Sequence, residues 1–161
     1  ASKIMKINFK QLLFSEFNIN NFEINFAQTQ YTQPLLFCIS YALAKQYEAW
    51  KIFPQALIGH SVGEIVAAAI SGVFSLEDAL TVVIERGRLM QQMKPGSMLS
   101  VQQDPSLIKE LIPKTVEVAL INTPNICVLS GTAEDISILK EQFDRQHIPS
   151  TIIRTSHAFH S

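Results

Sequence analysis

The spacing of apolar residues changes near Pro95-Gly96, and this change limits the folds open to the chain. Before it, apolar residues recur mainly at helical spacing. After it, short apolar runs of strand length alternate with two helical segments in the order β-α-β-β-α-β, which is the order of a ferredoxin-like unit. We therefore predict a first unit rich in helices and a small α+β unit that begins near Gly96.

The same patterns set approximate bounds for each element. In the small unit we predict strands at 98–102, 116–121, 126–130 and 150–153, with helices at 106–111 and 133–145. In the first part we predict a helix at 9–17, a helix opened by Gln33-Pro34 that runs to about residue 50, a short strand at 55–60, and helices at 62–71 and 76–92. Pro34 is expected in the first turn of its helix.

The bulk composition argues against several function classes. The chain has 161 residues, with 13 basic and 14 acidic side chains, so its net charge favours neither a nucleic acid nor a membrane as partner. It has no apolar run of about 18 residues and no signal peptide, which predicts a cytoplasmic protein. Cys38 and Cys127 lie in apolar runs without metal-ligand spacing, so we expect buried free thiols and no metal site.

The segment Gly59-His60-Ser61-Val62-Gly63 fits the pattern G-x-S-x-G between a predicted strand and a predicted helix. Small residues beside the serine allow a sharp turn that exposes its hydroxyl group. The backbone N–H of Val62, at the positive end of the helix, is placed to face a developing oxyanion. The alternative is a serine that only caps an ordinary helix.

A serine nucleophile at neutral pH needs a base, and the chain has four histidines. His60 is next to Ser61 and is expected to hold the corner, while His147 lies in a polar loop. His157 and His160 follow the last strand, where the chain could return to the nucleophile. The residues alone do not decide between these two.

Arg86 lies at the edge of the apolar stripe of its helix, between Val83 and Met90. The stripe consists of Leu76, Ala79, Leu80, Val83, Gly87 and Met90. The helices after Ser61 and before Arg86 each rise roughly 15 Å, so antiparallel packing would return Arg86 to the level of Ser61. There it could bind a substrate carboxylate bidentately. The alternative is an internal salt bridge.

Three motifs, GHSVGE, ERGRLMQ and SHAFHS, resemble those of acyltransferase domains of modular type I polyketide synthases. These domains are related to malonyl-CoA:acyl-carrier-protein transacylase and to the transferase domain of fatty acid synthase. The similarity runs from about residue 32 to 161. It implies an α/β fold: a large α/β-hydrolase-like subdomain, incomplete in this chain, with a ferredoxin-like α+β subdomain. The implied divisions are 1–95, 96–155 and a return segment at 156–161 that carries the catalytic histidine.

The resemblance also implies a ping-pong transfer of malonyl from coenzyme A to the phosphopantetheine thiol of an acyl carrier protein. No cofactor is bound by the domain itself, and neighbouring synthase domains such as a ketosynthase are implied partners. By the same resemblance, Ser61 and His160 are the catalytic residues, and Val62 contributes to the oxyanion hole. Arg86 binds the substrate carboxylate, and His157 and Phe159 select the extender unit. Gln33 and His60 are further residues of the pocket. HAFH resembles the malonyl type of this motif.

The chain departs from the family at both ends. It begins after the Gly-Gln-Gly-x-Gln segment that supplies a second oxyanion-hole amide in the family, and it ends one residue after His160. We therefore expect little transferase activity from the chain alone, and exposed apolar surface. No aspartate is placed for a triad, so we expect a Ser-His dyad.

Two rival functions are weighed against the transferase. One is a serine esterase or thioesterase of the α/β type, which predicts the order Ser, acid, His and no arginine in the pocket. The other is a non-catalytic fragment that only binds a carrier protein or a neighbouring domain.

Overall fold

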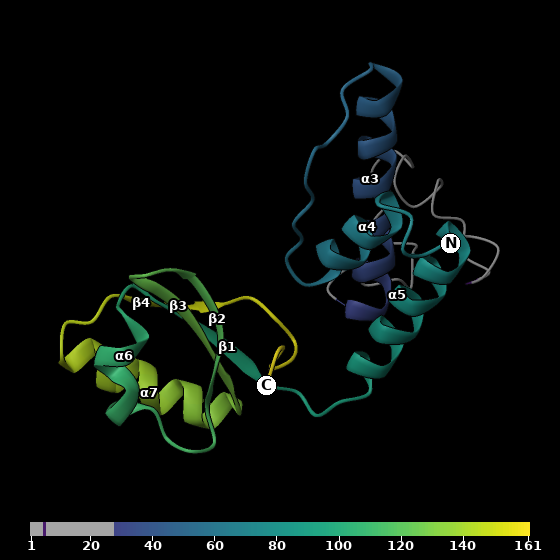
Figure 1. Ribbon diagram of the computed structural model, residues 1–161. Coiled ribbons are helices and arrows are strands. Elements are labelled where there is room, and N and C mark those ends of the chain that lie inside the picture. Colours follow the sequence, from purple (N-terminus) through teal and green to yellow (C-terminus); the bar gives the residue numbers. More distant parts are fainter. Residues whose placement is uncertain (1–4, 6–27) are drawn as a thin grey trace, which may run out of the picture. The chain divides into compact units, whose positions relative to one another are not determined.

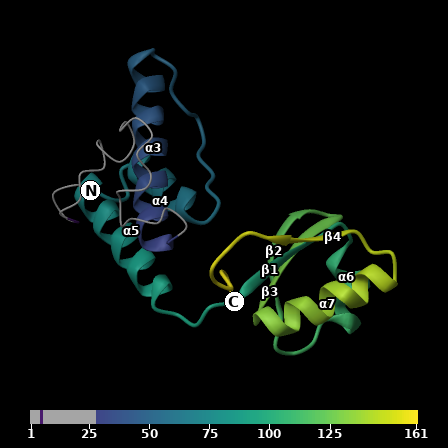
Figure 2. The same cartoon turned by 180° about the vertical axis from the view of Figure 1, so that it is seen from behind.

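The chain forms two compact units, residues 1–92 and 93–161. The computed structural model describes Met5 and residues 28–161, and Figures 1 and 2 show both units from opposite sides. The boundary lies three residues before the predicted one between residues 95 and 96. The helix predicted at 9–17 lies outside the described residues. The combination of helices and a sheet agrees with the predicted α/β class.

The described part of the first unit includes the helices α3 (Thr29–Ala49), α4 (Val62–Ile70) and α5 (Leu76–Gln91). They pack together around a small apolar core (Figure 1). The buried members of this core are Phe37, Val66, Ala79, Leu80 and Val83. Leu76, the first residue of the predicted apolar stripe, lies outside this core and is exposed at the start of α5.

Helix α3 begins four residues before the predicted start, so Pro34 lies inside the helix and not in its first turn. The extra turn is held by a tertiary contact, because the Thr29 backbone N–H donates to Gln91 Oε1 at 2.9 Å. An N–H group in the first turn has no partner within its own helix, so an acceptor on α5 stabilises this start. The sequence of α3 alone could not predict this contact, because the acceptor lies on another helix.

The ends of α4 and α5 agree with the prediction to within about a residue. Gly72, just beyond α4, has a φ of +82°, a conformation that glycine adopts without steric cost. Ser75 caps α5, and its hydroxyl oxygen accepts from the Asp78 backbone N–H at 3.0 Å. These local signals define the α4–α5 turn that lies between Ser61 and Arg86.

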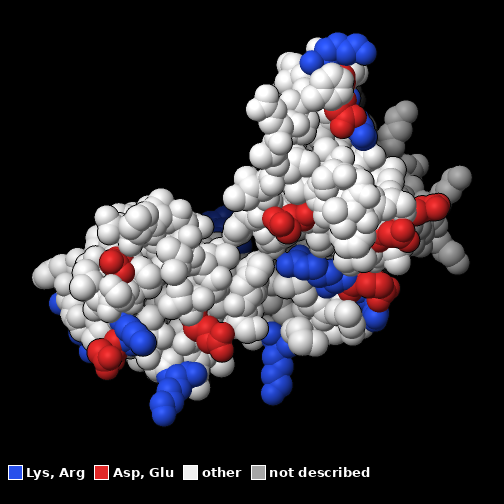
Figure 3. All heavy atoms as spheres, viewed as in Figure 1, with Lys and Arg blue, Asp and Glu red and all other residues white. Residues whose placement is uncertain are grey.

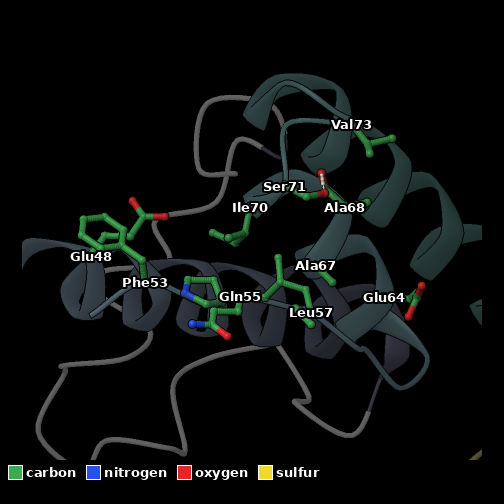
Figure 4. A pocket seen from close by; sticks show the side chains of 12 residues that line it. Glu48, Phe53, Gln55, Leu57, Glu64, Ala67, Ala68, Ile70, Ser71 and Val73 are labelled. Carbon is green, nitrogen blue, oxygen red and sulfur yellow. Dashed lines mark hydrogen bonds between the residues drawn. The ribbon is translucent and has the colours of Figure 1, made fainter. Parts of the chain in front are cut away.

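The strand predicted at 55–60 is wrong, because these residues form bends and irregular chain. A strand needs a neighbour whose N–H and C=O groups complete its ladder, and no described segment pairs with this one. Ile58 is 97% exposed as a result. Beside it, a cavity of about 570 Å³ lies between the segment 53–57 and one face of α4 (Figure 4).

The second unit contains a four-stranded antiparallel sheet in the order β2-β3-β1-β4. Its strands are β1 (Ser97–Val101), β2 (Glu117–Thr123), β3 (Ile126–Gly131) and β4 (Ser150–Ile153). Its helices are α6 (Pro105–Ile108), the 3-10 helix η2 (Lys109–Leu111) and α7 (Ala133–Arg145). This order and pairing confirm the predicted ferredoxin-like unit.

The predicted helix at 106–111 is divided into α6 and η2. The Ile112 N–H donates to the Lys109 carbonyl at 3.3 Å, an i to i+3 bond that tightens the last turn. Helix α7 packs on the sheet, where Leu99, Leu129 and Phe143 are fully buried. The core of the second unit thus forms between α7 and one face of the sheet (Figure 2).

The two cysteines are free thiols in different surroundings. Cys127 is fully buried in the core of the second unit, as predicted, but Cys38 is only partly buried beside the core of the first. Burial raises the pKa of both thiols, so both are held in the protonated form.

The surface carries a mixture of charges. On the face drawn in Figure 3, basic and acidic side chains are interspersed over both units. Among the helices that the structure describes, none is long and apolar enough to cross a bilayer.

Candidate active site

Ser61 lies at a sharp corner immediately before α4. Its φ of 55° is rare for a residue with a side chain. Two backbone bonds close the turn: the Gly63 N–H donates to the His60 carbonyl at 2.9 Å, and the Glu64 N–H donates to the Ser61 carbonyl at 3.1 Å. Backbone strain of this kind is concentrated at functional sites. The Ser61 side chain caps no backbone N–H of α4. The alternative interpretation, in which Ser61 serves only to cap the helix, is therefore not supported.

Gly59 makes this corner possible because the chain passes very close to it. A Cβ atom on Gly59 would lie 2.1 Å from the backbone nitrogen of Glu64. The Gly59 N–H in turn donates to Glu64 Oε2 at 3.0 Å, which ties the start of the corner to the first turn of α4. Gly63, the other glycine of the motif, is different, since a Cβ there would meet no described atom within 4 Å.

This difference predicts opposite effects for two Gly→Ala substitutions. Gly59→Ala should destabilise the first unit by about 3 kcal/mol or more, because backbone atoms must move to admit the methyl group. Gly63→Ala is the matched control and should be neutral or stabilise by up to about 1 kcal/mol, since it removes a glycine from a helix. Urea unfolding followed by circular dichroism measures both, and equal midpoints would show that the close approach at Gly59 is unimportant.

Val62 is the first residue of α4, and His60 lies on the exposed side of the corner. The first N–H groups of a helix have no acceptor within the helix and carry its partial positive charge. The Val62 N–H is thus of the type that binds an oxyanion. Its role, and that of His60, stay predictions.

Arg86 reaches the corner from α5. Its Nη2 donates to Ser61 Oγ at 3.0 Å, so two residues 25 positions apart meet as the helix lengths predicted. Arg86 is partly buried, and this burial lowers the pKa of its guanidinium, which stays charged at neutral pH. The ion pairs of the described residues join Lys45 to Glu48, Arg88 to Glu85, Lys140 to Asp144 and Arg145 to Glu141. Within the described chain the alternative of an internal salt bridge for Arg86 is therefore contradicted.

Gln33 of α3 is the second contact of Arg86. Its Oε1 accepts a hydrogen bond from Arg86 Nη1. Resemblance placed Gln33 in the pocket, but the reasoning from residues missed this contact. The sequence did contain a hint of this role. Gln33 is a polar residue one helical turn after Thr29, on the buried side of α3, and a buried polar residue needs a partner.

The residues of the SHAFHS motif belong to the second unit. His157 is 5% exposed, and its Nδ1 lies 2.7 Å from Ser156 Oγ. The His157 ring lies against the Phe159 ring, with centroids 5.9 Å apart. The backbone of His157 also forms a β-bridge with Pro95. The segment predicted as a separate return at 156–161 is thus held within the second unit. His160 lies in an exposed turn with a φ of 59°.

All four aspartates of the chain have structural partners. Asp78, Asp104 and Asp135 accept hydrogen bonds at helix starts, and Asp144 pairs with Lys140. Their positions agree with the expectation of a dyad, which stays a prediction. No described group of three His, Cys, Asp or Glu side chains could hold a metal ion.

Known proteins resemble this chain across most of its length. A family model for the acyl transferase domain matches residues 11–161. The chain is 38% identical over 130 residues to a component of the phenolphthiocerol/phthiocerol polyketide synthase of Mycobacterium tuberculosis, covering 81% of this chain and 9% of that protein. It is 39% identical over 140 residues to the PKS-NRPS hybrid synthetase ATPKS of Aspergillus niger, covering 83% of this chain and 8% of that protein.

Solved structures show the same similarity. The acyl transferase domain of ZmaA aligns with a TM-score of 0.84 and 34% identity, over 99% of this chain and 38% of that one. The malonyl-CoA:ACP transacylase of Synechocystis sp. PCC 6803 aligns with a TM-score of 0.74 and 28% identity, over 84% of this chain and 47% of that one. The chain thus spans less than a tenth of these curated relatives and less than half of these solved structures.

Proposed function

Because the chain belongs to the acyltransferase domain family of polyketide synthases, we propose that it carries the nucleophile and the acid-binding arginine of a malonyl transferase. The reaction moves a malonyl extender unit from coenzyme A to the phosphopantetheine thiol of an acyl carrier protein. Both thioesters are substrates, and the domain binds no cofactor of its own.

The observation that carries this proposal is the 3.0 Å contact between Arg86 Nη2 and Ser61 Oγ. A malonyl group bears a carboxylate one methylene away from the carbonyl that Ser61 would attack. A guanidinium within hydrogen-bonding distance of the nucleophile is therefore in reach of that carboxylate. Acyl groups without a free carboxylate cannot pair with this charge. Arg86 therefore supports selection of acyl-CoA substrates that carry a free carboxylate, such as malonyl-CoA.

In the proposed mechanism Ser61 Oγ attacks the malonyl thioester carbonyl while His160 accepts the serine proton. The Val62 N–H stabilises the oxyanion, with a contribution of ~10²–10³ in rate for such a donor. The carbon–sulfur bond breaks, and coenzyme A leaves as the thiol with the proton held by His160. The carrier thiol then gives its proton to the histidine and attacks the carbonyl carbon of the serine ester. The bond between that carbon and Ser61 Oγ breaks, and Oγ takes the proton back from the histidine. A base of this kind contributes ~10²–10⁴.

The preference for malonyl over methylmalonyl is proposed to come from His157 and Phe159. His157 is buried, and its ring contact with Phe159 limits where the phenyl ring can lie. A phenyl ring in the extender pocket would occupy the space of an α-methyl branch. One methyl group supports about 1–3 kcal/mol of discrimination, so the preference should be clear but not absolute.

Partners and location belong to the same proposal. An acyl carrier protein must deliver the accepting thiol, and a ketosynthase is the neighbouring domain that would use the loaded extender. We propose the cytoplasm as the compartment, where both thioesters are available. The contact between Arg86 and Ser61 weighs against the esterase alternative, which predicts no arginine at the nucleophile.

Intact-mass measurement of the full-length protein after exposure to malonyl-, methylmalonyl- and acetyl-CoA tests this function. We expect an increment of one malonyl group per chain, a smaller yield with methylmalonyl-CoA and the least with acetyl-CoA. Transfer of the label to an added carrier protein separates a transferase from an esterase, which would release free acid. A chain that binds carrier protein without acquiring any label would be the non-catalytic fragment.

A further inference from the structure

We infer that Gln33 is a positioning residue that holds Arg86 at the nucleophile with an uncharged acceptor, so that the positive charge stays available to the substrate. This inference rests on the proposed function and gives a specific task to a residue that resemblance places only in the pocket. It predicts that the charge at position 33 controls the choice between acyl groups with and without a free carboxylate.

The orientation of the Gln33 amide follows from its partners. An arginine has only donors, so the group that meets Arg86 Nη1 must be the amide oxygen Oε1. The amide nitrogen Nε2 then points to Thr29 Oγ1 at 2.6 Å and to Met90 Sδ at 3.2 Å. The oxygen and both amide hydrogens of Gln33 thus have partners, which leaves one orientation for this side chain.

Burial and a chain of contacts hold Gln33 in that orientation. Gln33 is 7% exposed and Thr29 is 6% exposed, so turning the amide would leave polar atoms without partners away from water. Thr29 is itself fixed, because its backbone N–H donates to Gln91 Oε1 at 2.9 Å. Met90 and Gln91 lie at the end of the same helix that carries Arg86. The contacts of Gln33 therefore connect α3 to α5 at the level of the arginine.

The neutral charge of Gln33 matters as much as its position. A buried arginine is most often balanced by a carboxylate, which would satisfy the guanidinium and compete with any incoming acid. An amide oxygen supplies a hydrogen bond but leaves the net charge in place. Arg86 has five N–H donors, and its contacts with Gln33 and Ser61 use two of them. As far as the described residues are concerned, the other donors are open to a bidentate ligand.

The substitution Gln33→Glu tests this inference because it keeps the size and the acceptor oxygen but adds a charge. In the full-length protein we measure kcat and KM for Ser61 acylation with malonyl-CoA and with acetyl-CoA. We expect kcat/KM for malonyl-CoA to fall roughly 10- to 100-fold, mainly through KM, because carboxylate binding is lost in ground state and transition state alike. Acetyl-CoA, which has no carboxylate, should change by less than about threefold.

Gln33→Met supplies a second variant, with an uncharged side chain of similar length and no acceptor. It should also lower malonyl-CoA acylation while keeping acetyl-CoA acylation, because Arg86 loses the contact that orients it. Gln46→Glu is the matched control, since it makes the same change on an exposed position of α3 and should leave both substrates unaffected. A merely structural role for Gln33 would lower both substrates together.

The outcomes separate this inference from the function on which it rests. Wild-type protein that acquires malonyl, together with an unchanged malonyl-to-acetyl ratio in Gln33→Glu and Gln33→Met, would overturn the positioning role alone. Parallel loss of both substrates in the two variants would also overturn it. Wild-type protein that acquires no malonyl would overturn the proposed function, and the inference with it.

Discussion

Replacing Ser61 with alanine should abolish the covalent intermediate, with transfer falling by a factor on the order of 10⁴ or more, as for other serine nucleophiles. The reason is that no other described hydroxyl shares the corner geometry of Ser61, with its φ of 55° and its 3.0 Å contact to Arg86 Nη2. Intact mass after incubation with malonyl-CoA measures the loss directly. The full-length protein should show no malonyl increment.

Ser71→Ala is the matched control for this experiment. Ser71 follows the other end of α4, and its hydroxyl donates to the Ala68 carbonyl at 3.1 Å on an exposed surface. Its loss should leave labelling intact. A malonyl increment that persists in Ser61→Ala would place the nucleophile elsewhere in the protein and would remove the basis of the proposed mechanism.

Replacing Arg86 with alanine should give the second-largest effect, and a selective one. Malonyl-CoA acylation should fall roughly 10²–10³-fold, since two charge-assisted hydrogen bonds to the substrate carboxylate are lost. Acetyl-CoA acylation should be retained or should rise, because a partly buried charge that finds no partner on an acetyl group has been removed. The measurement is kcat/KM for both substrates. Arg86→Lys should recover only part of the malonyl activity, because an ammonium cannot bind a carboxylate as a planar fork.

Arg88→Ala controls for the general effect of removing a positive charge from α5. Arg88 is exposed and pairs with Glu85 at 2.7 Å, two residues along the helix from Arg86. It should change neither substrate. If Arg86→Ala lowered malonyl and acetyl transfer to the same extent, the arginine would stabilise the fold and not the substrate carboxylate.

The elements that the sequence predicted well are those with local start and stop signals. Helix α7 and strand β4 have the predicted bounds, and Thr132 caps α7 by accepting from the Asp135 N–H at 3.1 Å. Capping residues act over three or four positions, so the pattern contains the information. The strand predicted at 55–60 failed for the opposite reason, since a strand exists only with a partner that lies elsewhere in the chain.

The residues of the candidate site also fall into two groups, those that the sequence placed correctly and those that it did not. Motif spacing and helix length placed Arg86 at the level of Ser61, and their contact confirms that geometry within the first unit. The contact of Arg86 with Gln33 joins positions 53 residues apart on two helices, and no local pattern predicts which polar group a partly buried arginine meets. The base and selectivity roles of His160, His157 and Phe159 stay predictions that rest on resemblance.

By itself, then, the sequence determined the ends of α4, α5 and α7, the ferredoxin-like order of the second unit and the corner that presents Ser61. These features depend on interactions between residues that are close in sequence, so short stretches of the sequence are enough to predict them. Only the tertiary structure decided that α3 starts at Thr29 and that the guanidinium faces Ser61. It also decided that Gln33, and no acid among the described residues, meets Arg86. Such choices depend on which side chains are buried together when the helices pack, and a buried polar group takes whichever partner that packing supplies.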